Sequence, residues 1–309
     1  MRYQTTTRYR LLSALAWNRN ERDEWLTGRE KRMMITCRRW CGAITAVVVL
    51  LTMGAVDAHA AGIVPPRDPV ANIAPSPSYN TTSGHSYVIG SPLPPCWRWH
   101  GGKFLANALS KQCVGAEVQA SERAHRLEHV AAFTLPRNFS QLSANEQSLV
   151  LVDIERVSRG EPPVLGLSSA ADAMAQTGAR QNADPTLTNP HAIPGATGGW
   201  TANWAAAVSP LDANYSWMYL DGWGGKGATL NFTCTTPTSP GCWGHRNDIL
   251  VNSTQLPCYV ARCALIMGAG YVPSNWAKTY NSYTELIIQV AATTPPPLIY
   301  TWRQALAAG

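Results

Sequence analysis

The sequence predicts an α+β fold, because its helical patterns come first in the chain and its strand patterns come last. Two capping signatures, at residues 143–146 and 169–172, open apolar segments with helical spacing. Two short apolar runs, at residues 264–272 and 283–292, follow near the C-terminus and are separated by turn-forming residues. This order favours a mainly antiparallel sheet that is covered by helices.

Caps and helix-breaking residues set the bounds of each expected helix. Residues 117–133 place alanines and a leucine on one stripe, and Pro136 stops the segment. The helix after the first capping signature is expected to end at Gly160, and the helix after the second at about Asn182. Residues 210–220 are a further helix candidate.

The N-terminal part of the chain has the pattern of a secretory signal peptide. The apolar run at residues 41–56 follows four basic residues and precedes Ala58-His59-Ala60, a small-x-small end typical of a cleavage site. Because residues 1–32 are polar, Met33 or Met34 is an alternative start of the chain. The sequence therefore predicts a secreted, extracellular or cell-envelope protein, with membrane contact only if the signal segment stays uncleaved.

Charge is concentrated in this leader. The full chain has 25 Lys+Arg against 19 Asp+Glu and a net charge of +6. Without residues 1–60 the balance is 15 against 14. A nucleic-acid partner needs a concentrated basic surface, so this balance argues against one.

Composition divides the remainder into four parts. Residues 61–95 are rich in Pro and Ser and have few large apolar side chains, which is typical of an extended linker. A disulfide loop and an accessory helix are expected at 96–137, the main domain at 138–293, and a peripheral Pro-rich tail at 294–309.

Six cysteines follow the leader, an even number that is typical of a disulfide set in an exported chain. Short loops favour pairing between neighbours, which predicts the pairs Cys96–Cys113, Cys234–Cys242 and Cys258–Cys263. Structural zinc is the alternative, and the lack of a C-x-x-C pair in the sequence argues against it.

Residues 241–250 hold the strongest signal for a functional site, because they combine a cysteine, an indole, a histidine and a carboxylate. Gly244 allows the backbone to bend close to a pocket wall, so His245 is expected to point into a cleft. Nearby indoles offer flat walls for a ligand, although indoles also fill protein cores. The expected ligand contacts are Trp204, Trp217, Trp243 and Asp248.

A second motif points to different chemistry. His125, Glu128 and His129 match H-x-x-E-H, a zinc-peptidase pattern with two histidines one helical turn apart. The charged residues around them favour a solvated helix face instead.

Several motifs, taken in order, resemble the CAP superfamily of cysteine-rich secretory, antigen 5 and pathogenesis-related proteins (the SCP-like domain), in a divergent bacterial secreted form. The residues that carry the resemblance are Gly244–Leu250 for the Gly-His signature, Glu155-Arg156 with Pro162–Leu165 for the opening helix and its turn, 171–181 for the second helix, and Met267–Tyr271 for the next strand. The match covers about residues 142–290.

The resemblance implies a three-layer α-β-α sandwich with a cleft of two histidines and two acids, which in some members holds a divalent metal. Carried over by position, the implied ligands of a zinc ion are His191, Asp221 and His245. The other acid belongs to a Gly-Glu-Asn motif, and here Ala202 stands in its place. The resemblance also implies non-catalytic binding of a lipid, glycan or peptide. A metal-dependent hydrolase and an envelope scaffold without pocket chemistry are the alternatives.

Overall fold

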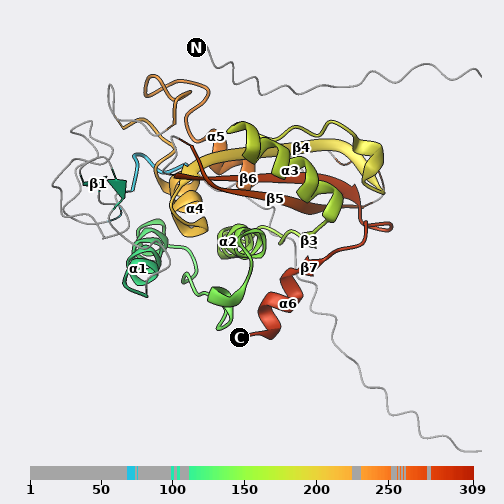
Figure 1. Ribbon diagram of the computed structural model, residues 1–309, viewed down its shortest axis with the longest axis horizontal. Helices are drawn as coiled ribbons and strands as arrows, with labels where there is room; N and C mark the ends of the chain where they lie inside the picture. The colour runs from blue at the N-terminus through green and yellow to red at the C-terminus, as the bar shows by residue number, and fades with distance from the viewer. Residues whose placement is uncertain are drawn as a thin grey trace, which may run out of the picture. The chain divides into compact units, whose positions relative to one another are not determined.

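The computed structural model describes residues 68–73, 75, 99–100, 103–104, 111–224, 231–251, 256, 258, 260, 262–276 and 280–309. Within these residues, six helices pack on a five-stranded, mixed and mostly antiparallel sheet (Figure 1). The α+β prediction is therefore confirmed. The predicted leader lies outside the described residues, as does most of the predicted linker.

The strands of the sheet follow the order β4-β6-β5-β3-β7. The long strands β4 (Ala196–Ala207), β6 (Tyr280–Ala291) and β5 (Cys263–Trp276) pair antiparallel. The short strand β3 (Gly166–Leu167) runs parallel to β5 and antiparallel to β7 (Tyr300–Thr301). The predicted pair of C-terminal strands is confirmed as β5 and β6. Strand β4 is missing from the prediction, because its glycines and alanines hide the alternation of a strand.

One face of the sheet is covered by α3 (Ser169–Gln181), whose alanines pack directly on the backbone of β5 (Figure 1). A Cβ at Gly268 would collide with the carbonyl of Ala171, and a Cβ at Gly270 would lie 2.6 Å from the carbonyl of Ala175. The two glycines of β5 therefore allow the close approach of this helix. The core on this side also contains Ile266, Leu286, Ile288 and Val290.

The opposite face carries α2 (Ala144–Ser158) and α4 (Pro210–Tyr219), with α1 (Lys111–Glu128) beside α4 (Figure 1). Their apolar residues form the larger core with the sheet, including Leu149, Leu151, Val152, Met218, Met267 and Ile287. Helix α4 confirms the helix candidate at 210–220, and its N-terminus is capped by Ser209, which accepts from the Asp212 N–H.

The expected helix start at Ser143 is confirmed, because the capping box of Ser143 and Glu146 forms as predicted. Two other expected helix starts differ from the structure. The second signature is shifted by one residue, since Ser168 and not Ser169 is the N-cap, and this N-cap makes no side-chain bond. The Asp172 carboxylate instead accepts from Ala269 N of β5 at 2.8 Å. Helix α1 begins at Lys111 and ends at Glu128, where His129 adopts a left-handed φ of 57°.

The predicted peripheral tail is part of the fold. It contributes β7 and α6 (Trp302–Ala307), which begins with a second capping box at Thr301 and Gln304 and buries Ala305. Upstream of α1, β1 (Trp99–His100) and β2 (Lys103–Phe104) pair antiparallel.

Two predicted disulfides are present, Cys234–Cys242 and Cys258–Cys263. Cys113 is buried in α1, and Cys96, its predicted partner, lies outside the described residues. Disulfides form and persist in oxidising compartments. Among the described helices, none has the length and apolar character needed to cross a membrane.

Candidate functional site

His245 lies in the first turn of the short helix α5 (Gly244–Ile249). Trp243 precedes the helix with a left-handed φ of 61°, so the chain turns sharply before His245. Asp221, directly after α4, accepts from the Arg246 N–H at 3.2 Å and so satisfies a free N–H of the first turn. The same carboxylate also binds the histidine.

His245 and Asp221 form an ion pair with 2.6 Å between Nδ1 and Oδ1. The Asp221 side chain is 1% exposed, whereas the His245 side chain is 23% exposed. Asn231 Nδ2 also donates to Asp221 Oδ1, at 2.7 Å. Because Asp221 holds Nδ1 from the buried side, Nε2 is the ring nitrogen left for a ligand.

Two further carboxyl groups act on this pair. Asp184 follows α3 in the chain and Asp248 lies in α5. Burial alone would lower the pKa of His245, but the charge and hydrogen bond of Asp221, together with Asp184 and Asp248, raise it to about 9. Burial raises the pKa of Asp248 to about 8, against the opposing charge of His245. At neutral pH the site is therefore an imidazolium surrounded by acids.

Two buried side chains of the sheet, the amide of Asn203 and the carboxyl group of Glu285, are hydrogen-bonded to each other next to His245. Asn203 of β4 donates through Nδ2 to His245 O at 3.0 Å and to Glu285 Oε1 of β6 at 2.6 Å. Both side chains are buried. Burial is the main cause that raises the pKa of Glu285 to about 8, and the nearby Asp248 adds to it. Glu285 is therefore mainly protonated at neutral pH.

We expect the stability of the domain to fall as the pH rises from about 5 to 8, and Glu285→Gln to remove part of that fall. The pKa of Glu285 is raised above its ordinary value of 4.5 to about 8, so its stabilising effect is complete below pH 4.5 and is lost as the pH rises through 8. Urea unfolding of both proteins at several pH values measures this difference. If the free energy of unfolding changed equally with pH in the wild type and in Glu285→Gln, the conclusion that Glu285 is neutral would be contradicted.

The predicted ligand contacts occupy mostly buried positions. Trp217 is buried and donates to Trp204 O at 3.2 Å, while Trp204 donates to Ser282 Oγ at 2.7 Å and packs edge-on against Trp276. Trp243 is also buried, with the Arg246 guanidinium 5.9 Å from its ring centre. Two of these three tryptophan side chains are therefore buried in the protein, and the half-buried Trp204 is the most exposed of the three.

Of the three predicted zinc ligands, the structure brings Asp221 and His245 into direct contact. His191 lies in a short 3-10 helix, Pro190–Ala192, and is exposed, outside the groups that act on His245. Ala202 packs on the α3 side of the sheet, and its neighbour Asn203 is the residue that contacts His245. Within the described ranges, no three His, Cys, Asp or Glu side chains are grouped so as to hold a metal ion. The zinc site stays a prediction.

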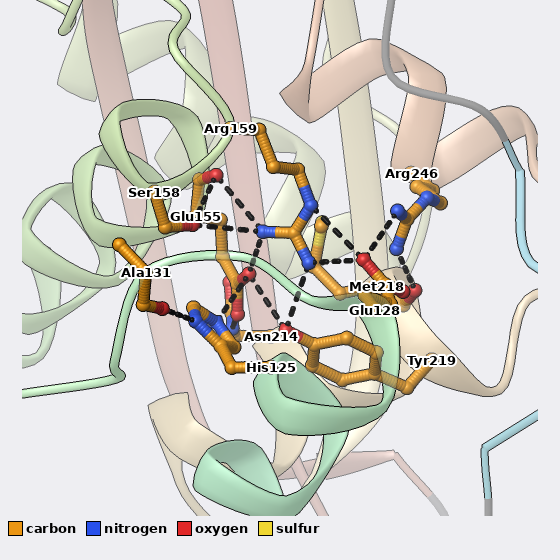
Figure 2. Close-up of polar contacts among 10 residues, drawn as sticks. All are labelled: His125, Glu128, Ala131, Glu155, Ser158, Arg159, Asn214, Met218, Tyr219 and Arg246. Carbon is orange, nitrogen blue, oxygen red and sulfur yellow. Dashed lines mark hydrogen bonds and ion pairs between the residues drawn. The ribbon is translucent and has the colours of Figure 1, made fainter.

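A buried polar network joins the helices behind the site (Figure 2). Glu155 of α2 is its centre and accepts from His125 at 3.1 Å, Arg159 at 2.6 Å, Tyr219 at 2.7 Å and Asn214 at 2.9 Å. Burial alone would raise the pKa of Glu155, but the charge of Arg159 and the bond from His125 lower it to about 2. Glu155 is therefore an anion at neutral pH.

The network continues to the helix that carries His245. Glu128 Oε2 accepts from Arg159 at 2.6 Å and from Arg246 of α5 at 2.9 Å, and Arg246 also donates to Met218 O at 2.8 Å (Figure 2). Arg246 is 1% exposed. Four helices thus share buried charges, which fixes α5 relative to α1, α2 and α4.

This network also explains the H-x-x-E-H pattern. His125 is buried and bonded to Glu155 and Ala131 O, while Glu128 pairs with arginines. His129 lies beyond the end of α1 and is exposed. The two histidines do not share one helical face, so the pattern is structural here.

Sequence reasoning missed Asp184 and Glu285. Asp184 precedes Pro185, a pattern that by itself indicates only the end of a helix. Glu285 is a single carboxylate in the apolar run 283–292, and such an isolated charge in a buried strand is a usable signal for a site.

In comparisons with known proteins, the chain matches no protein-family model, no curated protein and no solved structure. The fold and the site by themselves define an α+β domain with disulfides and a half-buried histidine–aspartate pair.

Proposed function

We propose that this chain is a secreted, CAP-like binding protein, built as a three-layer α-β-α sandwich. Helices on both faces of a mostly antiparallel sheet support the proposal, as do the two disulfides. The Gly-His signature at Gly244-His245 supports it further, because the histidine lies at a polar, partly open position.

The single observation that carries the proposal is the geometry of the His245–Asp221 pair. A buried carboxylate binds Nδ1 of a histidine whose side chain is 23% exposed. The raised pKa of His245, about 9, keeps the ring protonated at neutral pH. An imidazolium donates a hydrogen bond but has no lone pair for a metal or for a proton, which favours binding over hydrolysis.

The charges around the pair indicate the class of ligand. His245 offers a charged N–H, and the carboxyl groups of Asp184 and Asp248 lie near enough to raise its pKa. Hydroxyl and amide groups satisfy such a mixture of donors and acceptors, whereas an acyl chain does not. We therefore favour a glycan or a peptide over a lipid as the ligand.

The test is to screen the purified protein against a glycan array and a library of short peptides, and to repeat the screen with His245→Ala. We expect the affinity for retained ligands to fall by about 10- to 100-fold, the range for a lost hydrogen bond to a charged group. His191→Ala is the matched control, because it removes an exposed histidine of a short 3-10 helix, and it should bind like the wild type.

Two results would contradict the proposal. The first is unchanged binding by His245→Ala. The second is one zinc ion per chain that is lost on His245→Ala together with a hydrolytic activity, which would establish the metal-dependent hydrolase instead.

A further inference from the structure

Residues 68–73, which we call the arm, lie against the C-terminal end of α4, although they belong to the predicted linker. Asn72 Nδ2 donates to Gly222 O at 3.0 Å, and Gly222 N donates to Asn72 Oδ1 at 2.8 Å. Ile73 N donates to Tyr219 O at 2.8 Å, and Tyr215 Oη donates to Ile73 O at 2.9 Å. Ile73 also packs on the larger core. The arm is thus hydrogen-bonded to the domain through both backbone and side chain.

The contact of Asn72 reaches the residue next to Asp221. Gly222 has no room for a side chain, because a Cβ there would collide with the Trp243 ring and lie 2.7 Å from Asn72 Oδ1. Trp243 N in turn donates to Asp221 O at 3.1 Å. Asn72, Gly222 and Trp243 therefore form one packed contact that adjoins Asp221 on one side and α5 on the other.

The other end of the arm lies beside α5. The charge of Arg246 and a hydrogen bond from Asn247 both act on the Asp68 carboxyl. Between the arm and α1 lies a cavity of about 500 Å³, lined by residues that include Leu127 and Glu128. The arm thus spans from the end of α4 to α5, the two places that supply Asp221 and His245.

We propose that the arm is a positioning element of the His245 site, and that Asn72 is the positioning residue. Asn72 holds Gly222 by two hydrogen bonds, Gly222 fixes the backbone beside Asp221, and Asp221 orients the imidazole of His245. The arm acts on the site in the absence of any ligand.

The test uses nuclear magnetic resonance on the full chain with Asn72→Ala. Without the Asn72 acceptor, we expect the Gly222 amide to exchange with water about 10-fold faster or more. We also expect the Nδ1 proton resonance of His245, which the bond to Asp221 protects, to broaden or disappear. A merely structural contact of the arm would change the first signal and leave the second intact.

Two variants give the comparison. Val70→Ala is the matched control, because Val70 lies on the same arm and its side chain is fully exposed, and both signals should stay as in the wild type. Asn72→Asp keeps the acceptor for Gly222 N–H and loses the donor, so it should lie between the wild type and Asn72→Ala.

The proposal is overturned if the His245 Nδ1 proton stays protected in Asn72→Ala, whether or not Gly222 exchanges faster. This experiment contains no ligand. Its failure is therefore distinct from a failure of the proposed binding function, which is measured on the arrays.

Discussion

Replacing Glu155 by alanine is expected to lower the free energy of unfolding by about 3–5 kcal/mol, the cost of removing one partner from a buried ion pair. Glu155 is fully buried, and its loss leaves His125, Asn214 and Tyr219 without the acceptor that they share. Arg159 would keep Glu128 as an anionic partner. Chemical denaturation measures the change.

The matched control is Glu122→Ala, on the exposed face of α1. Its i,i+4 pair with Arg126 spans 3.8 Å between exposed side chains, and such pairs contribute little. We expect a stability close to that of the wild type. A similar loss in both variants would show that the network around Glu155 has no special role.

Glu155 also makes an acid-side prediction. Its pKa is lowered from an ordinary 4.5 to about 2, so the stability that it contributes is complete above pH 4.5 and is lost as the pH falls through 2. This is the opposite direction from Glu285, whose contribution is lost on the alkaline side. Glu155→Gln should flatten the acid limb of the stability profile and leave the alkaline limb unchanged.

Gly268→Ala is the second substitution with a large expected effect, about 3 kcal/mol of destabilisation. The new Cβ would overlap the carbonyl of Ala171 and lie 2.6 Å from Asp172 N. Helix α3 would have to move away from β5 and stretch the bond from Ala269 N to Asp172. Thermal and urea unfolding measure the loss.

Gly115→Ala provides the matched control with the same chemical change. Gly115 lies within α1, and among the described residues no atom apart from the neighbouring backbone of this helix stands within 4 Å of the position of its Cβ. Alanine is favoured over glycine in a helix by up to about 1 kcal/mol, so this variant should be slightly more stable than the wild type. If Gly268→Ala and Gly115→Ala changed the free energy of unfolding in the same direction, the close contact between α3 and β5 would be contradicted.

Features formed by residues close together in the chain could be predicted from the sequence. The capping box at Ser143 and Glu146, the pairing of β5 with β6, and the disulfides Cys234–Cys242 and Cys258–Cys263 all follow from residues close together in the chain. Loop closure is cheapest over such short separations, and caps act within one helical turn.

The sequence predicted less well which residues lie at the candidate site and which elements carry them. The sequence indicates His245 and Asp221, which the structure brings into an ion pair, and it also indicates His191, which is exposed in a short 3-10 helix. Strand β4 went unpredicted, because its glycines, alanines and tryptophans show no clear period of two. The short helix α5 carries His245, and Asp221 from a distant element satisfies its first turn.

By itself, the sequence determined the helices that became α2, α3 and α4, the antiparallel pair of β5 and β6, and two neighbouring cysteine pairs, and it indicated the histidine of the candidate site. Only the tertiary structure decided which acids surround His245, why Glu285 is neutral, and where the arm lies. Asn72 meets Gly222 across 150 residues and Asn203 meets Glu285 across 82. Such contacts depend on how the helices cover the sheet, and no local propensity encodes them.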